Sequence, residues 1–208
     1  CSSERLEALR KSQLSSGLPP RYDGRCRGMD ERSAPTGVSP AFRFMVPEKA
    51  VSFDDAVHGH ISFEGRAIGD FVIIGSDGIA SYNFATAVDD ALMSITHIIR
   101  GDDHISNTPR QIMLLNSLGL PAPRYAHIPL VLGNDKAPLG KRGSSSSIEE
   151  LREEGFLAEA VLNSVARLGW SPADGFLSAD EMINSFSLDK LSKSPSIFDM
   201  ERLKSFNR

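Results

Sequence analysis

The stretch ITHIIRGDDHISNTPRQIMLLNSLGLPAPRYAHIPLVL, residues 95–132, decides the fold of this chain. Residues 95–99 are mostly apolar and β-branched, which predicts a buried strand. A helix is predicted next, because Thr108 suits the N-cap position and Gly119 suits the end of a helix. Residues 125–132 predict a second strand. Strand, helix and strand at this spacing indicate a βαβ unit with a parallel sheet and a right-handed crossover.

Polar residues follow both predicted strands at the same edge of the sheet. The segment RGDDH, from Arg100 to His104, follows the first strand, and a polar loop at residues 133–147 follows the second. Parallel sheets bind ligands beyond the carboxyl ends of their strands, so we expect both segments to face one crevice. Charges beside an apolar run cost several kcal/mol to bury unless a partner or a ligand compensates them. The segment RGDDH is therefore a candidate site, with a solvated turn as the alternative.

The segment before this unit predicts a hairpin that leads into a helix. Residues 71–74 and 80–84 are expected to form two short strands around a turn at Ser76-Asp77-Gly78. The helix is expected to begin near Val88. Asp89 and Asp90 would then lie at its start, where carboxylates suit the positive end of the helix dipole.

The first 70 residues predict one helix followed by short strands. Residues 3–14 have apolar side chains at helical spacing, with Ser2 or Ser3 as the cap. Residues 41–46 alternate and predict a strand. Four apolar residues set among acids and glycines predict a small β-rich region: Phe53, Val57, Ile61 and Phe63.

Composition limits the classes of function. With 208 residues, 40% of them hydrophobic, the chain can form one large domain or two small ones. A formal net charge of -4 excludes a generally basic nucleic-acid binder and leaves room for a local basic face. No apolar run approaches the ~20 residues that cross a bilayer, so no membrane partner is expected. Two cysteines make no disulfide framework, which favours a cytoplasmic protein.

The loop at residues 133–147 is suited to polyphosphate. It does not match the phosphate loop of nucleotide hydrolases, because six residues separate Gly133 from Gly140-Lys141 where that motif has four. Its cations Lys136, Lys141 and Arg142 can still neutralise the charge of a phosphate chain. A solvated linker is the alternative.

The last 60 residues predict helices. Ser147 with Glu150 and Ser178 with Glu181 form two capping boxes. Two short helices are expected around Pro195. An apolar stripe is expected in the core, with Trp170 packing against the helix end; the stripe consists of Leu157, Ala160, Val161, Val165 and Leu168.

Six segments, in order along nearly the whole chain, together resemble a bacterial glutamyl-tRNA synthetase. They are RYDGRCR (21–27), DFVIIGSDGIASYNF (70–84), VDDALMSITHIIRGDDHISNTPRQIMLL (88–115), YAHIPLVL (125–132), LNSVARLGWSP (162–172) and LSKSPSIFD (191–199). The resemblance implies an α/β fold of the class I synthetases, in which an inserted acceptor-binding domain splits a Rossmann-type catalytic domain. Residues 1–69 then resemble part of that α+β insertion, residues 70–132 the second half of the Rossmann domain, and residues 133–208 the signature loop and a helical stem-contact domain.

The resemblance also implies an activity. Such enzymes activate glutamate with ATP and Mg²⁺ and ligate it to the acceptor stem of tRNA, in the cytoplasm. The chain is expected to be a monomeric fragment without the first Rossmann half and the anticodon domain, and to be inactive by itself.

The family's functional residues map onto six positions. Tyr82 and Arg100 fall where the family binds the amino acid, and Lys141 aligns with the catalytic lysine of the signature loop. The positions expected to bind ATP are Leu130, Val131, Lys141 and Arg142. Pro138 and Gly140 replace the first lysine and the serine of that loop. The stretch Lys190-Leu191-Ser192-Lys193-Ser194 spells the signature better but lies too far beyond the strand.

No metal site is expected. Some family members hold zinc in the insertion with four ligands, whereas here only Cys1 and Cys26 match and Gly28 stands at the histidine position. The pair His58 and His60 is more simply two surface histidines.

Three other functions stay open. One is a paralogue that glutamylates a modified base in tRNA-Asp, and another is a non-catalytic tRNA-binding relic. The third is a hydrolase that uses carboxylate pairs from Asp89, Asp90, Asp102 and Asp103, although adjacent aspartates point in different directions.

Overall fold

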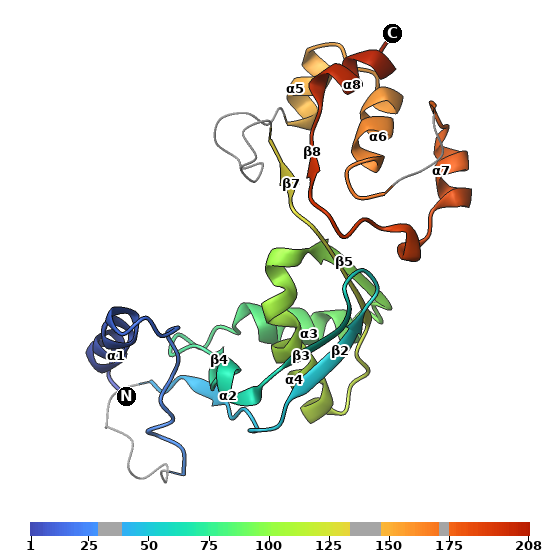
Figure 1. Ribbon diagram of the computed structural model, residues 1–208. Helices are drawn as coiled ribbons and strands as arrows, with labels where there is room; N and C mark the ends of the chain where they lie inside the picture. Colours follow the sequence, from blue (N-terminus) through green and yellow to red (C-terminus); the bar gives the residue numbers. More distant parts are fainter. Residues whose placement is uncertain (29–38, 134–146, 171–174) are drawn as a thin grey trace. The chain divides into compact units, whose positions relative to one another are not determined.

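A computed structural model of the chain describes residues 1–28, 39–133, 147–170 and 175–208 (Figure 1). The chain divides into two compact units. The first consists of Cys1–Phe53, His60–Thr96 and Ser106–Pro123. The second consists of Asp54–Gly59, His97–Ile105 and Arg124–Arg208.

The first unit begins with the predicted helix. Helix α1 (Ser3–Ser15) is capped by Ser2, whose hydroxyl accepts a hydrogen bond from the backbone N–H of Arg5. Strand β1 (Phe42–Phe44) pairs antiparallel with β4 (Phe71–Ile74). The rings of Phe44 and Phe71 stack across this pair with centroids 5.3 Å apart. The strand predicted at residues 41–46 is thereby confirmed.

Strands β2 (Val51–Asp55) and β3 (Gly59–Phe63) confirm the predicted β-rich region. The short helix α2 (Gly65–Ile68) follows them. They belong to a four-stranded sheet whose order is β3-β2-β6-β5, where β5 is His97–Gly101 and β6 is Arg124–Ile128. Exposed and buried residues alternate along β2, and this alternation puts Phe53 and Asp55 on the buried side.

Helices α3 (Tyr82–Leu92) and α4 (Thr108–Leu118) pack together in the first unit (Figure 1). Their shared core contains Ala87, Leu114 and Leu115. Gly119 ends α4 in the left-handed conformation, with φ 68°, as predicted. The predicted cap is displaced by one residue, because Asn107 is the N-cap and the fully buried Thr108 is the first helical residue.

The predicted second strand of the hairpin is wrong, and so is the predicted start of α3. Ala80 forms only an isolated bridge to Ile74, and the helix begins six residues before Val88, at Tyr82. Phe84, Ala87 and Ala91 then lie at helical spacing and pack into the core around α4. Tertiary packing thus outweighs the local strand pattern. Consequently Asp89 and Asp90 lie in the last turns of α3 and do not begin it.

The second unit contains the predicted parallel pair. Strand β5 (His97–Gly101) pairs parallel with β6 (Arg124–Ile128), and α4 connects them in sequence. The end of β2 pairs parallel with β6 through Asp55 and Tyr125. The strand predicted over residues 125–132 is interrupted at Pro129, which has no N–H to donate to a sheet. After Pro129, β7 (Val131–Leu132) pairs with β8 (Ser196–Ile197) instead.

Helices form the rest of the second unit: α5 (Ile148–Glu153), α6 (Ala158–Ala166), α7 (Ala179–Ser185) and α8 (Met200–Phe206). Both predicted capping boxes are present. The core of α5, α6 and α8 holds Leu151, Ala160 and Leu203. The predicted stripe is partly wrong, because Leu157 and Val165 are exposed.

Around Pro195 the chain forms α8 and the 3-10 helix η3 (Leu188–Lys190), with β8 between them. Trp170 is buried, and its ring contacts the ring of Phe186 edge to face, with centroids 5.6 Å apart. Among the described residues, no helix has both the length and the apolar character that a membrane crossing requires.

Candidate functional site

The carboxyl ends of β5 and β6 form the candidate site. Their register sets Arg100 opposite His127 and Gly101 opposite Ile128. Leu130 lies against the same edge, because a Cβ atom added to Gly101 would come 3.4 Å from its Cδ2 atom. The predicted parallel strand is confirmed, but it covers His97–Gly101 and so includes Arg100. The prediction that it is buried is wrong, because Ile99 is 48% exposed.

Arg100 is held by two aromatic side chains of β6. Its Nε–H donates a hydrogen bond of 3.1 Å to Nε2 of His127. Its guanidinium carbon lies 5.7 Å from the centroid of the Tyr125 ring, within range of a cation–π interaction. The rings of Tyr125 and His127 are nearly parallel, with centroids 6.1 Å apart. One strand therefore supplies both a platform and an acceptor for the guanidinium group.

Behind His127 lies a buried carboxylate. Oδ2 of Asp55 is 2.6 Å from Nδ1 of His127, and both side chains are fully buried. The Asp55 carboxylate also accepts hydrogen bonds from the backbone N–H groups of Val57, His58 and His127. An inward-facing acid on β2 is thus satisfied by four N–H donors.

The burial of this pair determines its charge. Burial alone would raise the pKa of Asp55, but the hydrogen bonds from His58, His127 and Val57 outweigh it, and the pKa lies below its usual value. For His127, burial lowers the pKa, the Asp55 contact opposes it, and the Arg100 cation lowers it further. The pair at neutral pH is therefore an Asp55 carboxylate and a neutral imidazole.

The other predicted site residues are distributed over the chain. Tyr82 is the first residue of α3 and is exposed; it belongs to the first unit, whereas Arg100 belongs to the second. Leu130 is exposed and Val131 is half-buried in β7. Several predicted residues lie outside the described part of the chain, namely Lys136, Pro138, Gly140, Lys141 and Arg142.

The acidic residues after β5 begin a 3-10 helix, η2 (Asp102–Asn107). Asp103 is exposed and lies 3.8 Å from Nε2 of His104. A Cβ atom at Gly101 would come against the carboxylate of Asp103, an exposed side chain that would have to move aside. Asp103 is therefore packed closely over the end of β5.

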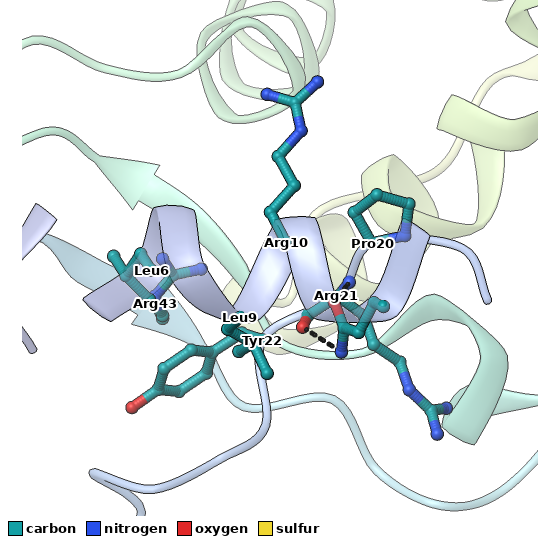
Figure 2. A pocket seen from close by; sticks show the side chains of 8 residues that line it. Leu6, Leu9, Arg10, Pro20, Arg21, Tyr22 and Arg43 are labelled. Atoms are coloured by element: carbon teal, nitrogen blue, oxygen red, sulfur yellow. Dashed lines mark hydrogen bonds between the residues drawn. The ribbon is translucent and has the colours of Figure 1, made fainter. Parts of the chain in front are cut away.

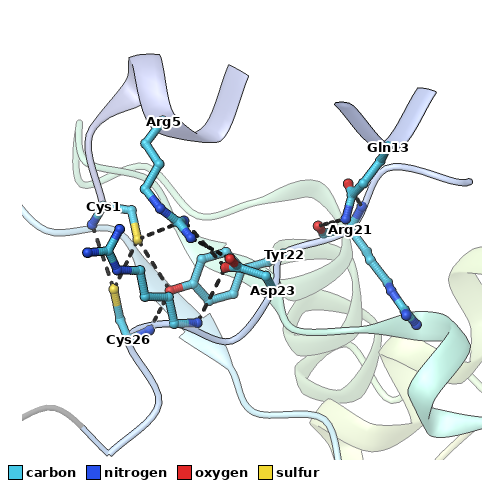
Figure 3. Close-up of polar contacts among 8 residues, drawn as sticks. Cys1, Arg5, Gln13, Arg21, Tyr22, Asp23 and Cys26 are labelled. Atoms are coloured by element: carbon cyan, nitrogen blue, oxygen red, sulfur yellow. Dashed lines mark hydrogen bonds and ion pairs between the residues drawn. The ribbon is translucent and has the colours of Figure 1, made fainter. Parts of the chain in front are cut away.

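Cys1 and Cys26 meet in the first unit (Figure 3). Their sulfur atoms are 3.1 Å apart, and the Tyr22 hydroxyl accepts a hydrogen bond from the Cys26 backbone at 2.8 Å. A hydrogen bond with that hydroxyl lowers the pKa of the Cys26 thiol. Arg5 and Asp23 form an ion pair beside the two thiols. Over the described residues, no group of three or more histidine, cysteine or acidic side chains gathers as metal ligands would, and the two thiols are fewer than the four ligands of a structural zinc site.

A hollow of about 180 Å³ is lined by α1, by the segment that follows it and by Arg43 of β1 (Figure 2). The guanidinium carbon of Arg43 is 4.4 Å from the centroid of the Tyr22 ring. The amide of Gln13 holds the backbone of Arg21 through hydrogen bonds of 2.9 and 3.0 Å. Arg10 extends away from the other side chains that line the hollow.

Sequence patterns alone did not identify Asp55 and His127 as part of the site. The usable signal was positional: Asp55 occupies the same face of β2 as the buried Phe53, and His127 lies inside a strand. A polar residue at an inward position needs a partner, since leaving it unsatisfied costs about 1–3 kcal/mol.

Comparison with known proteins places these features in context. Residues 1–205 match the family described as tRNA synthetases class I (E and Q), catalytic domain. A glutamate–tRNA ligase of Heliobacterium modesticaldum is 47% identical and is aligned with 100% of this chain and 43% of its own length. A glutamate–tRNA ligase of Sulfurihydrogenibium sp. is 43% identical, with 100% of this chain and 45% of the relative aligned.

Comparison with solved structures gives the same similarity to glutamate–tRNA ligases. A crystal structure of a glutamate tRNA ligase from Elizabethkingia meningosepticum, in complex with its amino acid, superposes with a TM-score of 0.85 at 31% identity. That comparison covers 100% of this chain and 48% of the other. This chain therefore spans somewhat under half the length of the relatives that it matches.

Proposed function

Because this chain belongs to the class I tRNA synthetase (E and Q) catalytic-domain family, we propose that it forms part of a glutamate–tRNA ligase. Such a protein uses ATP to activate glutamate and joins it to tRNA. The observation that carries the proposal is the similarity to glutamate–tRNA ligases along the whole of this chain, at 42% to 47% identity. Similarity restricted to one nucleotide-binding segment would support ATP use alone. Similarity through the strands, the connecting helix and the later helices supports a shared substrate as well.

The proposed division of labour follows the family order. Residues 1–69 belong to the acceptor-binding insertion, residues 70–132 to the second Rossmann half, and residues 133–208 to the signature loop and the stem-contact domain. The macromolecular partner is then the acceptor stem of tRNA. The protein that binds it is a monomer in the cytoplasm.

Glutamate is bound by Tyr82 and Arg100. A guanidinium group offers two parallel N–H donors that match the two oxygens of a carboxylate, and a tyrosine hydroxyl adds one directional bond. The position of Arg100 at the carboxyl end of a parallel strand supports this role, because ligands of parallel sheets collect at that edge.

ATP is bound by the segment that follows β6. We assign the adenine to the backbone of Leu130 and Val131, and the phosphates to Lys141 and Arg142, with Mg²⁺ as the counter-ion of the nucleotide. Cations near the phosphates stabilise the charge that develops as the adenylate forms and pyrophosphate leaves.

Aminoacylation by the full-length protein tests the proposal, with ATP, Mg²⁺, labelled glutamate and tRNA-Glu. Arg100→Ala is expected to raise the KM for glutamate about 100-fold, since two charge-assisted hydrogen bonds are lost. Lys141→Ala is expected to lower kcat by about 100-fold or more, as the loss of one transition-state contact does. Lys193→Ala is the matched control: this exposed lysine lies in the other signature-like stretch, and its loss is expected to change neither constant.

Three outcomes would contradict the proposal. One is glutamylation of tRNA-Asp in place of tRNA-Glu. Another is tRNA binding without any response to ATP or glutamate. The third is an effect of Lys193→Ala equal to that of Lys141→Ala, which would move the signature to residues 190–194.

A further inference from the structure

We infer that His127 is a positioning residue, which the buried Asp55 holds in one tautomer so that its Nε2 atom fixes the guanidinium group of Arg100 toward an incoming carboxylate. The inference rests on the proposed function, because it concerns the arginine assigned to glutamate. It adds Asp55 and His127 to the residues proposed to act on glutamate. Both lie in the second unit together with Arg100.

The tautomer of His127 follows from its neighbours. An arginine Nε always carries a proton and can only donate, so the 3.1 Å contact requires Nε2 of His127 to be an unprotonated acceptor. The ring proton must then lie on Nδ1, where the Asp55 carboxylate accepts it at 2.6 Å. A neutral ring with its proton on Nδ1 is the one form of His127 that satisfies both neighbours.

Asp55 is fixed in turn by the backbone. Hydrogen bonds from the N–H groups of Val57 and His58 hold its Oδ1 atom at 2.9 and 3.0 Å. The carboxylate therefore cannot rotate away from His127 without losing buried hydrogen bonds. A continuous series of hydrogen bonds therefore runs from Asp55 at the end of β2, through His127 on β6, to Arg100 on β5.

The hydrogen bonds from Asp55 through His127 also limit which edge of Arg100 can bind a substrate. A guanidinium group has two edges that can bind a carboxylate with two parallel bonds, one formed by Nε and an Nη atom and the other by the two Nη atoms. Since Nε donates to His127, the edge formed by Nε and an Nη atom cannot bind a carboxylate with two parallel bonds. The Tyr125 ring beneath the guanidinium carbon restricts tilting of its plane. Orientation of this kind reduces the entropy lost when the carboxylate binds.

Two substitutions separate the two hydrogen bonds of His127, one with Asp55 and one with Arg100. His127→Asn keeps an N–H donor near the Nδ1 position, and so keeps the Asp55 bond, but it is too short to reach Arg100. His127→Gln places an acceptor near the Nε2 position and so keeps the Arg100 bond. His60→Asn, at an exposed histidine of β3, is the matched control.

The full-length variants are compared by their KM for glutamate and for ATP, and by the rise in melting temperature on addition of glutamate. His127→Asn is expected to raise the glutamate KM about 10- to 100-fold, as the loss of a hydrogen bond to a charged group does. His127→Gln is expected to recover most of this loss. The KM for ATP and the behaviour of His60→Asn are expected to remain those of the wild type.

A structural readout accompanies the kinetics. Long-range ¹H–¹⁵N spectra of protein labelled in histidine are expected to show His127 neutral at pH 7, with its proton on Nδ1. A proton on Nε2 would overturn the inference whatever the kinetics show.

The outcomes distinguish the inference from the proposed function. If Arg100→Ala raises the glutamate KM and His127→Asn does not, the positioning role fails while the proposed function stands. If Arg100→Ala leaves the glutamate KM unchanged, the assignment of glutamate to Arg100 fails and the inference fails with it. Equal increases in both KM values for His127→Asn would indicate general distortion and would also overturn the inference.

Discussion

Replacement of Asp70 by Asn is expected to destabilise the first unit by about 2 to 3 kcal/mol. The side chain of Asp70 is 5% exposed, and its carboxylate accepts hydrogen bonds from Nε and Nη2 of Arg27 and from the backbone N–H of Val46 at 2.8 Å. Buried hydrogen bonds to a charged group contribute about 1.5–3 kcal/mol each. Solvent screens the two bonds from Arg27, whose side chain is 41% exposed, so the expected cost arises on the buried side of the pair. There the amide that replaces the carboxylate sets an N–H₂ group against the Nε–H donor of Arg27, and a buried donor without an acceptor costs about 1–3 kcal/mol.

Amide hydrogen exchange at Val46 measures this effect directly, because its N–H is one of the three donors. Glu48→Gln is the matched control in the same unit: its ion pair with Arg66 is exposed at both ends, so its loss is expected to leave the stability of the unit nearly unchanged. The fluorescence of Trp170, which lies in the second unit, is expected to be unaffected by either change.

The dependence on pH gives the refuting result. Hydrogen bonds from Arg27 hold the pKa of Asp70 below its usual value. A carboxylate whose pKa is lowered by folding stabilises the folded state fully above its unfolded pKa of about 3.9 and loses that contribution as the pH falls through the folded value. The difference between wild type and Asp70→Asn should therefore be constant near neutral pH and shrink below about pH 4. A difference as small as that of Glu48→Gln, or one that does not shrink in acid, would refute the reasoning.

Two further predictions concern stability. Gly65→Ala is expected to cost about 2 kcal/mol or more in urea denaturation, because its Cβ would collide with the backbone carbonyl of Pro47, whereas Gly169→Ala, with open space around the new atom, should be neutral. Ser178→Ala is expected to cost about 1 kcal/mol, since Ser178 caps α7, as seen in thermal unfolding. Ser81→Ala should cost less than about 0.5 kcal/mol, because its hydroxyl makes no capping bond to α3. Equal effects within either pair would contradict these explanations.

Local sequence signals predicted the central part of the fold. The parallel pair of β5 and β6 follows from two apolar runs separated by a helix with clear start and stop residues. Each capping box also forms where its serine and glutamate stand three residues apart. The predictions of these elements were correct because each element is determined by interactions within one helical turn or one strand.

Features that depend on distant partners were predicted less well. The strand pattern at residues 80–84 is genuine, but Phe84 gains more by packing with α4 than by extending a hairpin, and no local rule weighs these two choices. Likewise Asp89 and Asp90 have the composition of a helix start yet lie near the end of α3. Arg100 was identified as a site residue because a charge stood out against an apolar run. Asp55 and His127, which support Arg100, were missed because each is a single polar residue inside a strand.

The buried polar residues of this chain indicate how such residues can be found. Asp55 pairs with His127, 72 positions away, and Asp70 pairs with Arg27, 43 positions away. Asn163 is fully buried and exchanges hydrogen bonds with the backbone of Leu177 in both directions. In each case a polar side chain occupies an inward position, where an unmet donor or acceptor costs about 1–3 kcal/mol. A stable fold must therefore supply a partner, and that partner need not be near in sequence. An inward polar residue in a strand or helix thus predicts a long-range contact, and where the partner adjoins a sheet edge that binds ligands, as His127 adjoins Arg100, it predicts a residue that shapes the site.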